Sequence, residues 1–492
     1  MKNLKLGFLA ILLAFVFQGF GQDNVFLDRK FWDTKPDVKT VKTKMEEGHN
    51  PAEANGNNFD GVVYATLQEA PLKTITYLLS QKGNDVNKLT HDGRTYIFWA
   101  AYKGNEKLVK YLLKKGAKTD ITDDKGNTII NFAAGAGQKN TAVYDLLIKS
   151  NSKLITRANP NGANAILLAA PSDNDFKLTD YFQSKGLDIN SKDTNGNGIF
   201  NYAAKTGNIE MMTALLDKGI KGTDQAFIFA ANGARGTTNG IEVYKFLKKV
   251  GLSPIVVNNE GVSPLHIVAK RNTDFEVINY LFKNGLDVNA LDDNGNNAVM
   301  NAASGNSLEV VKHLSRNLKS TSTINKKGQS ALTLAIVGNA ADVVGFLIKN
   351  GYKTDILDAK GNNLAYYLID SYSPRRKKTF YEKLELLQAN NVDLSKVQKN
   401  GNTWFHLAVE KNSLDVLELA LKMNQDINAK NKEGNTALHL AALKATDDAI
   451  LKFLIKHGAK KDLVTDFEES AYDLAKENEL LKKNNIAIEF LK

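Results

Sequence analysis

Apolar residues recur in closely spaced pairs along the chain, and their spacing predicts short amphipathic helices. In several segments they fall at positions i, i+1, i+4 and i+5, which places one apolar stripe on a helix of about 3.6 residues per turn. These segments contain Leu108, Val109, Leu112 and Leu113; Val277, Ile278, Leu281 and Phe282; Val343, Val344, Leu347 and Ile348; and Ile450, Leu451, Leu454 and Ile455. A glycine follows each stripe, as Gly116 and Gly285 do, and is expected to end the helix with a left-handed residue.

Polar turns separate these helices at a regular interval. The turns end in a glycine at Gly61, Gly93, Gly126, Gly162, Gly196, Gly261, Gly295, Gly328, Gly361, Gly401 and Gly434. Most intervals lie between 32 and 36 residues, and the longest, 65, is two periods. A hydroxyl residue such as Thr128 or Thr436 follows two positions later and can cap a first short helix. Because two short helices cannot bury their apolar stripe alone, the units must stack into an array.

These units resemble ankyrin repeats, which carry a Thr-Pro-Leu-His motif and a Gly-Ala-Asp-Val-Asn tail. The first motif resembles Ser263–His266, Thr403–His406 and Thr436–His439, and the second resembles Gly186–Asn190 and Gly285–Asn289. The resemblance covers nearly all of the chain after residue 60. It implies an all-α solenoid of about 12–13 helix-turn-helix units with short hairpin tips.

The predicted organisation has four parts: a signal peptide at 1–21, an N-terminal segment and capping half-repeat at 22–59, the repeat array at 60–464, and a C-terminal capping repeat at 465–492. A helix is expected over Asp37–Glu47. Two repeats are irregular, because one adds Asn232–Asn239 between its helices and another carries an insertion around Asp370–Thr379.

The first 21 residues have the pattern of a secretory leader. Lys2 and Lys5 precede an apolar run from Leu6 to Phe17, and the small residues Gly19 and Gly21 follow it. The run is short for a bilayer-spanning helix, although an uncleaved N-terminal anchor is the alternative. Cleavage would lower the formal net charge of +10 by two. The pattern predicts export to the periplasm or cell exterior, with no transmembrane segment in the mature chain.

Composition and motifs argue against catalysis. The chain contains no cysteine, which excludes disulfides, zinc–thiolate sites and cysteine nucleophiles. It has no phosphate-binding glycine loop of the common kinds and no serine in a Gly-x-Ser-x-Gly elbow. The histidines have no metal-ligand spacing, and paired acids such as Asp292-Asp293 are interpreted as turns that bind their own backbone amides. We therefore expect no enzyme activity, no cofactor and no metal site.

Two groups of residues have both a structural and a functional interpretation. His266, His406 and His439 occupy the motif position at which the resemblance implies hydrogen bonding within and between repeats. One position of the first helix is aromatic in five units. Packing in the core is the favoured interpretation of these aromatic residues, and a recognition surface is the alternative. They are Trp99, Phe132, Tyr202, Phe229 and Tyr367.

The candidate partner-binding residues are the variable positions that an ankyrin groove exposes. On the hairpin tips they are His91, Arg94, Asp124, Lys125, Lys326, Lys327, Lys399 and Lys432. At the ends of first helices they are Tyr102, Lys103, Lys205, Lys270, Arg271, Glu410, Lys411 and Lys444. A third group, Arg375, Arg376, Lys377 and Lys378, is expected in a loop that is either solvated or in contact with an acidic partner or an anionic surface.

The resemblance implies a non-enzymatic, monomeric protein that holds a partner protein along its concave groove. A secreted scaffold or host-facing effector is the alternative. Binding of an anionic glycan or nucleic acid is a weaker one, because a net charge of +10 is modest for 492 residues.

Overall fold

The computed structural model describes residues 24–234 and 236–492, and these contain helices, turns and four isolated backbone bridges but no strand. The all-α fold predicted from the sequence is confirmed. The chain divides into two compact units, unit 1 ending at Tyr202 and unit 2 beginning at Ala203. The predicted signal peptide at 1–21 lies outside the described residues.

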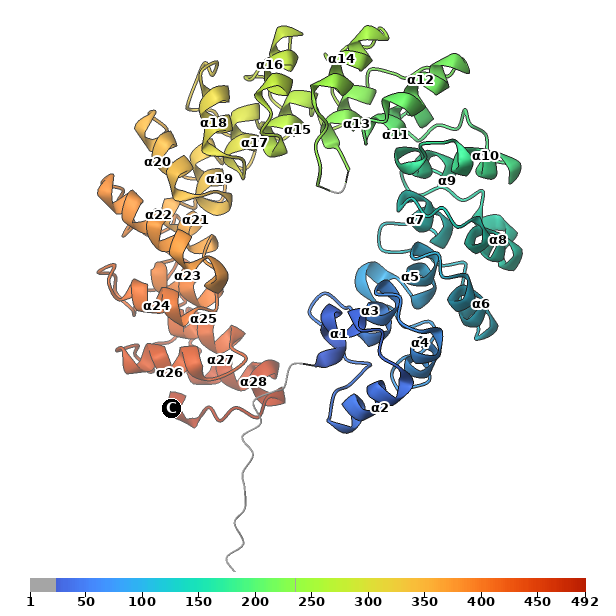
Figure 1. Cartoon of the computed structure of the whole chain (residues 1–492). Helices are drawn as coiled ribbons and strands as arrows, with labels where there is room; N and C mark the ends of the chain where they lie inside the picture. The colour runs from blue at the N-terminus through green and yellow to red at the C-terminus, as the bar shows by residue number, and fades with distance from the viewer. Residues whose placement is uncertain (1–23, 235) are drawn as a thin grey trace, which may run out of the picture. The chain divides into compact units, whose positions relative to one another are not determined.

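Unit 1 begins with short helices and continues as helix pairs (Figure 1). The N-terminal elements are η1 (Val25–Leu27), α1 (Arg29–Asp33) and α2 (Val38–Glu46). The pairs are α3 (Gly61–Leu67) with α4 (Leu72–Leu79), α5 (Tyr96–Tyr102) with α6 (Glu106–Lys114), α7 (Ile129–Gly135) with α8 (Thr141–Ser150), and α9 (Ala165–Ala169) with α10 (Lys177–Ser184). Short 3-10 turns are η2 (His91–Gly93), η3 (Ser152–Leu154) and η4 (Ala170–Ser172). The boundary between the units falls within α11 (Ile199–Ala204).

Unit 2 repeats the same arrangement. After α12 (Ile209–Asp217), its pairs are α13 (Ala226–Asn232) with α14 (Ile241–Lys249), α15 (Pro264–Arg271) with α16 (Phe275–Lys283), α17 (Ala298–Ala303) with α18 (Leu308–Ser315), α19 (Ala331–Gly338) with α20 (Ala341–Lys349), α21 (Leu364–Asp370) with α22 (Lys377–Ala389), α23 (Trp404–Glu410) with α24 (Leu414–Ala420), α25 (Ala437–Lys444) with α26 (Ala449–Lys456), and α27 (Ala471–Glu477) with α28 (Glu479–Lys483). Short turns are η5 (Pro374–Arg376) and η6 (Glu489–Leu491). Within unit 2 the first helices of the pairs lie on the concave side and the second helices on the outer side (Figure 1).

The first helices form where the sequence supplies a capping residue and small residues. In α25, the Thr436 hydroxyl accepts a hydrogen bond from the His439 backbone amide, which satisfies a free donor at the helix start. Ala441 and Ala442 are buried at the far end. Their small side chains let α25 pack closely against α23 and α27, so apolar faces are covered by neighbouring repeats as well as within one pair.

The three motif histidines connect successive repeats of unit 2. The Nδ1 atom of His406 accepts a hydrogen bond from the Thr403 amide, and its Nε2 atom donates to the Asn435 carbonyl of the next repeat. His266 and His439 make the corresponding bonds. Burial lowers the pKa of all three imidazoles below its ordinary value, so the neutral form is favoured. The predicted hydrogen bonding within and between repeats is present.

A row of asparagines forms a second connection between repeats in unit 2. The Asn306 side-chain amide, just after α17, donates to the carbonyls of Ala269 and Asn272 at the end of α15. Asn339 bonds in the same way to the carbonyls of Ala303 and Asn306. Each asparagine thus caps carbonyls that the preceding first helix leaves without an intrahelical partner.

The irregular segments lie where the sequence indicates. The helix expected at Asp37–Glu47 is α2, whose start is capped by the Asp37 carboxylate accepting from the Thr40 amide at 2.8 Å. Gly233 to Gly240 separates α13 from α14. The insertion near residue 370 forms η5 and the first turn of α22, which at 13 residues is longer than the other second helices.

Candidate partner-binding surface

Several hairpin tips are held by an acidic or amide side chain that binds its own turn. In the tip before α17, one Asp292 oxygen accepts hydrogen bonds from the amides of Asn294 at 2.9 Å and Asn296 at 2.8 Å. Gly295 adopts a φ of 84°, a left-handed conformation that glycine tolerates best. The paired acids are therefore turn-forming residues, as the sequence indicates, and the described residues contain no cluster that could hold a metal ion.

Backbone hydrogen bonds connect neighbouring tips of unit 2 into a continuous ladder. In every step, an amide of one tip donates to a carbonyl of the preceding tip. The bonds are Asp293 to Glu260 at 2.9 Å, Lys326 to Asn294 at 2.8 Å, Ala359 to Lys327 at 2.9 Å, Lys399 to Gly361 at 3.0 Å and Lys432 to Asn400 at 2.9 Å. This tip ladder fixes the spacing of the side chains that the tips present.

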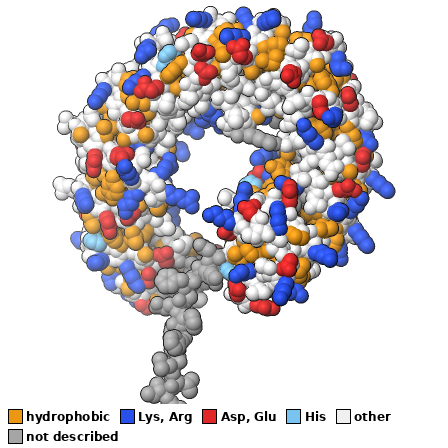
Figure 2. All heavy atoms as spheres, viewed as in Figure 1, with side chains coloured by type: hydrophobic (Ala, Val, Ile, Leu, Met, Phe, Trp, Pro, Cys, Tyr) orange, Lys and Arg blue, Asp and Glu red, His pale blue; other side chains and the backbone are white. Residues whose placement is uncertain are grey.

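Lysines occupy four consecutive tips of the ladder. We call them the tip lysines: Lys326, Lys327, Lys360, Lys399 and Lys432, all exposed. In the described part of the chain, none of them has a carboxylate oxygen within 4.0 Å. Lys and Arg side chains gather in Figure 2 along the edge of unit 2 where α21 and α23 lie. Four of the five are candidates from the sequence, and Lys360 is an addition from the structure, although it stands directly before the tip glycine, as Lys327 does.

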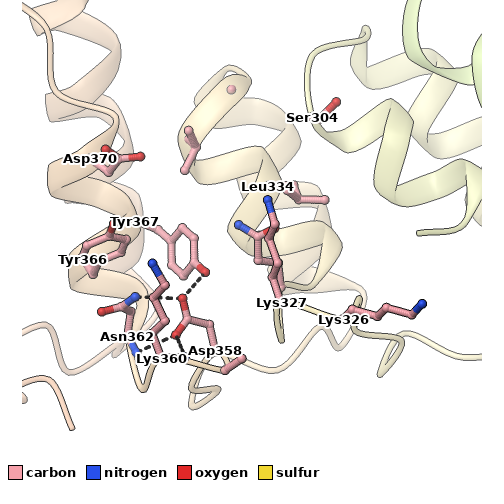
Figure 3. Close-up of a pocket in the computed structure, with 14 residues that line it drawn as sticks. Ser304, Lys326, Lys327, Leu334, Asp358, Lys360, Asn362, Tyr366, Tyr367 and Asp370 are labelled. Carbon is pink, nitrogen blue, oxygen red and sulfur yellow. Dashed lines mark hydrogen bonds between the residues drawn. The ribbon is translucent and has the colours of Figure 1, made fainter. Parts of the chain in front are cut away.

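A pocket of about 480 Å³ lies between the tips and first helices of two of these repeats (Figure 3). Lys326, Lys327 and Lys360 line it from the tips, and Leu334 and Val337 of α19 supply half-buried apolar surface. Tyr366 of α21 lines it as well, and burial raises the pKa of its hydroxyl. The pocket therefore combines free ammonium groups with apolar and aromatic surface.

The acidic residues of this pocket are already engaged. Burial alone would raise the pKa of Asp358, but hydrogen bonds from Asn362 and Tyr367 outweigh it and lower the pKa. The Tyr367 hydroxyl lies 2.7 Å from Asp358. Asp370, at the end of α21, lies 3.8 Å from the Lys411 ammonium group. The carboxylates thus stabilise the protein's own fold and leave the tip lysines unpaired.

On one side of the pocket, two backbone segments pack closely and fix its wall. Gly338, at the end of α19, approaches the end of α17 so closely that an added Cβ atom would overlap the Ser304 carbonyl oxygen. Both residues line the pocket. A side chain at position 338 would therefore push the two first helices apart.

The candidate tip residues of unit 1 have a different environment. Arg94, expected to be exposed, is only 6% exposed. Its guanidinium group donates to Asp123 at 3.1 and 2.9 Å and stacks 4.1 Å from the Phe132 ring centroid. The expectation of an exposed Arg94 is wrong because a carboxylate of the next repeat and an aromatic ring enclose it. The Lys125 ammonium group is exposed but pairs with Asp92 at 2.9 Å.

His91 and Asp124 complete the unit 1 tips. His91 stacks on Phe59 with ring centroids 4.4 Å apart, and its Nδ1 atom lies 2.9 Å from the Asn57 carbonyl oxygen. Asp124 is exposed. Asp124 and Lys125 are thus the exposed side chains of this group, whereas His91 is half-buried and Arg94 is buried.

The candidates at the ends of first helices divide into engaged and exposed residues. Tyr102 stacks on Phe132, and Lys103 pairs with Glu69 at 2.8 Å. The Lys411 ammonium group donates to the Asp370 carbonyl at 2.6 Å. Lys205 is half-buried. The exposed candidates are Lys270, Arg271, Glu410 and Lys444.

The four adjacent basic residues are not in a plain loop as expected. Arg375 and Arg376 lie in η5, and Lys377 and Lys378 form the first turn of α22. Lysine is unfavourable at a helix N-terminus. Lys377 is compensated by Asp415 at 2.9 Å. The helix forms because buried Phe380, Leu384 and Leu387 anchor it.

The aromatic position of the first helices belongs mainly to the core. Trp99, Tyr202 and Tyr367 are buried, whereas Phe132 and Phe229 are half-buried. The buried Trp99 indole donates to the Thr90 hydroxyl at 2.8 Å. The core interpretation therefore holds for the three buried rings.

Comparisons with known proteins give one family. The family model described as "Ankyrin repeats (3 copies)" matches residues 62–158, 166–290, 227–323, 265–358 and 376–465, which together exceed half of the chain. Among the described residues, no helix combines the length and apolar character needed to cross a bilayer.

One curated relative is the phosphocholine transferase AnkX of Legionella pneumophila, 32% identical over 131 residues. The match covers 26% of this chain but only 14% of that protein. Among solved structures, the human ASB11 ankyrin repeat domain is 22% identical with a TM-score of 0.37, over 46% of this chain and 97% of that chain. A chain of the Bdellovibrio bacteriovorus complex of the predatory endopeptidase Bd0816 with immunity protein Bd3460 is 28% identical with a TM-score of 0.34, over 41% of this chain and 99% of that chain.

Proposed function

Because the chain belongs to the ankyrin-repeat family, we propose that it is an exported, non-enzymatic binding protein that holds a partner protein on its tips and first helices. Ankyrin repeats form a protein–protein interaction module. The observation that carries the proposal here is the tip ladder, which holds exposed side chains of consecutive repeats in fixed positions before a partner arrives. A pre-ordered surface loses little conformational entropy on binding, so more of the contact free energy remains as affinity.

The test is site-specific photo-crosslinking in the native cell. A photoreactive amino acid replaces Lys399 on the tip ladder in one variant and Lys349, exposed at the end of α20, in the control. We expect one defined protein adduct from position 399 that is absent from position 349. Equal adducts from both positions, or none from position 399 and from further tip positions, would contradict binding at the tips.

Export is supported by the leader pattern of residues 1–21. Cell fractionation of the full chain and of a chain lacking residues 2–21 tests it, together with mass spectrometry of the mature N-terminus. We expect the full chain in the periplasmic fraction or the medium, cleaved near Gly21, and the shortened chain in the cytoplasm. The full chain in the cytoplasm would contradict export. An uncleaved N-terminus in the membrane fraction would indicate the anchor instead.

The phosphocholine transferase activity in the name of the Legionella relative is a property of that protein. The chain spans 14% of its length, so the match gives no support for the same chemistry here.

A further inference from the structure

Resting on the proposed function, we propose that the tip lysines bind an acidic, extended segment of the partner protein, with one large apolar side chain of that segment in the pocket of α19 and α21. The surface is defined by Lys326, Lys327, Lys360, Lys399 and Lys432 and by the pocket residues Leu334, Val337 and Tyr366.

The charge of this region is concentrated and bounded. Four consecutive tips carry five exposed lysines without carboxylate partners, and Glu433 is the single acidic residue at the outermost positions of those tips. The tips on either side carry Asp293 and Asp466 instead. A run of unpaired ammonium groups raises the local concentration of negatively charged groups. Because acidic tips lie on both sides of the four basic tips, the basic surface is four repeats long.

The tip ladder sets the length of segment that fits. Neighbouring helices pack about 8–10 Å apart, so consecutive tips are spaced by about that distance. A segment in the extended polyproline II conformation advances about 3.1 Å per residue with three residues per turn, so three residues span one step and every third side chain lies on the same face. A segment of about ten residues in this conformation, with Asp or Glu at every third position, would place one carboxylate at each of the four tips.

The pocket distinguishes a peptide from a simple polyanion. Its volume of about 480 Å³ and its apolar floor at Leu334 and Val337 are suited to a side chain rather than to a charged group. Asp358 and Asp370 also line it, and their negative charge opposes a carboxylate inside the pocket. An apolar side chain is accommodated there while the flanking carboxylates lie on the tips.

A nucleic acid is the less favoured occupant. Proteins that bind single strands without sequence preference stack the bases on exposed aromatic side chains. The outermost tip positions of these four repeats instead hold lysine, alanine, asparagine and glutamate, for example Ala359 and Asn400. Lysine alone provides charge contacts, which a peptide carboxylate satisfies equally well.

The experiment uses the full chain and a fluorescent ten-residue peptide with glutamate at every third position and one central phenylalanine. The tip variant changes Lys326, Lys327, Lys360 and Lys399 to Gln. The matched control removes the same charge at four exposed lysines near the ends of second helices: Lys283, Lys349, Lys422 and Lys456. Circular dichroism and thermal unfolding establish that both variants fold.

We expect the tip variant to bind the peptide at least about tenfold more weakly than the control variant and with a smaller dependence on salt. Replacing glutamate with glutamine in the peptide should have the same effect. Equal weakening in the tip and control variants would overturn the proposal, because it would indicate attraction by net charge alone. The proposal would also be overturned, in favour of nucleic acid, if a single-stranded oligonucleotide of equal charge bound more tightly than the peptide and lost the same affinity in the tip variant.

A second measurement addresses the pocket. Leu334→Asn should weaken the binding of the peptide that carries phenylalanine and leave unchanged the binding of a peptide that carries alanine at that position. Equal weakening for both peptides would contradict the assignment of the phenylalanine to the pocket. The outcomes also separate the inference from the proposed function. Suppose that position 399 crosslinks to one defined partner, but that this partner binds equally well at high salt and to the tip variant. The proposed function would then stand, and the recognition of an acidic segment would be contradicted.

Discussion

The basic tips of unit 1 and of unit 2 look alike in sequence but differ in what surrounds them. In unit 1, Arg94 is buried against Asp123, and Lys125 pairs with Asp92. In unit 2, the tip lysines stand beside neighbours that supply no carboxylate within 4.0 Å in the described chain. The same kind of charge therefore stabilises the fold in one unit and stays available to a partner in the other. The deciding factor is the residue that the next repeat places beside it.

The largest expected effect is on the buried pair of unit 1. Arg94→Ala leaves the Asp123 carboxylate buried without its cation, and loss of one partner of a buried ion pair costs about 3 kcal/mol or more. Lys125→Ala, in the same cluster but exposed, should cost less than about 0.5 kcal/mol. Hydrogen exchange of α5 and α7 measures the local opening free energy. Equal effects of the two changes would remove the distinction between a buried and an exposed ion pair at these tips.

Acidification should affect unit 2 more than unit 1. His266, His406 and His439 lie in unit 2, and burial lowers their pKa from the ordinary 6.5. The unfolded chain therefore binds more protons just below pH 6.5, and stability falls as pH decreases through that range. Above pH 6.5 their contribution is fully present. Hydrogen exchange at pH 7.5 and 5.5, corrected for intrinsic rates, should show lost protection at α15, α23 and α25, and an equal loss at α5 and α7 would contradict this.

Loss of one helix cap should have a smaller effect. Thr436→Ala removes the acceptor for the His439 amide at the start of α25, which costs about 1 kcal/mol. Thr436→Ser keeps the hydroxyl and serves as the control. Urea unfolding followed by circular dichroism measures the change. A stability loss in the Ser variant as large as in the Ala variant would assign the effect to the methyl group instead.

The smallest expected effect is on the tip lysines themselves. Lys327→Ala and Lys360→Ala should each change the unfolding free energy by less than about 0.5 kcal/mol, because the side chains are exposed and unpaired. Thermal unfolding of the two variants against the unaltered chain is the measurement. A loss above 1 kcal/mol would show that these residues belong to the fold, as Arg94 does.

The repeat register made the fold predictable from sequence. Turn glycines such as Gly295 and capping pairs such as Thr436 with His439 recur often enough to place each helix and its apolar stripe. The environment of Arg94 was not predictable in this way, because its partner Asp123 lies 29 residues later and the motif does not reveal their contact. Lys360 could have been found by counting back from Gly361.

The basic segment illustrates the other limit. The run of four charges inside the insertion favoured a loop in the sequence. The helix-forming residues that follow Lys377, with apolar Phe380, Leu384 and Leu387 at helical spacing, indicate the helix that the structure contains. Reading the apolar spacing before the charges would have predicted α22.

The asparagine row gives the array a direction. Each asparagine protects carbonyls of the repeat before it, so Asn478 covers those of Ala442 and Ala445, near the end of α25. Removal of the last helix pair would expose the capped carbonyls at the end of α25. Loss of a repeat from the N-terminal side of unit 2 exposes no such carbonyl in the next repeat, because the asparagine that caps each repeat comes from the repeat after it. A processive protease that enters unit 2 from the C-terminus would therefore uncover these carbonyls at α25, α17 and α15 as it advances, and one that enters from the other side would meet repeats whose caps are intact.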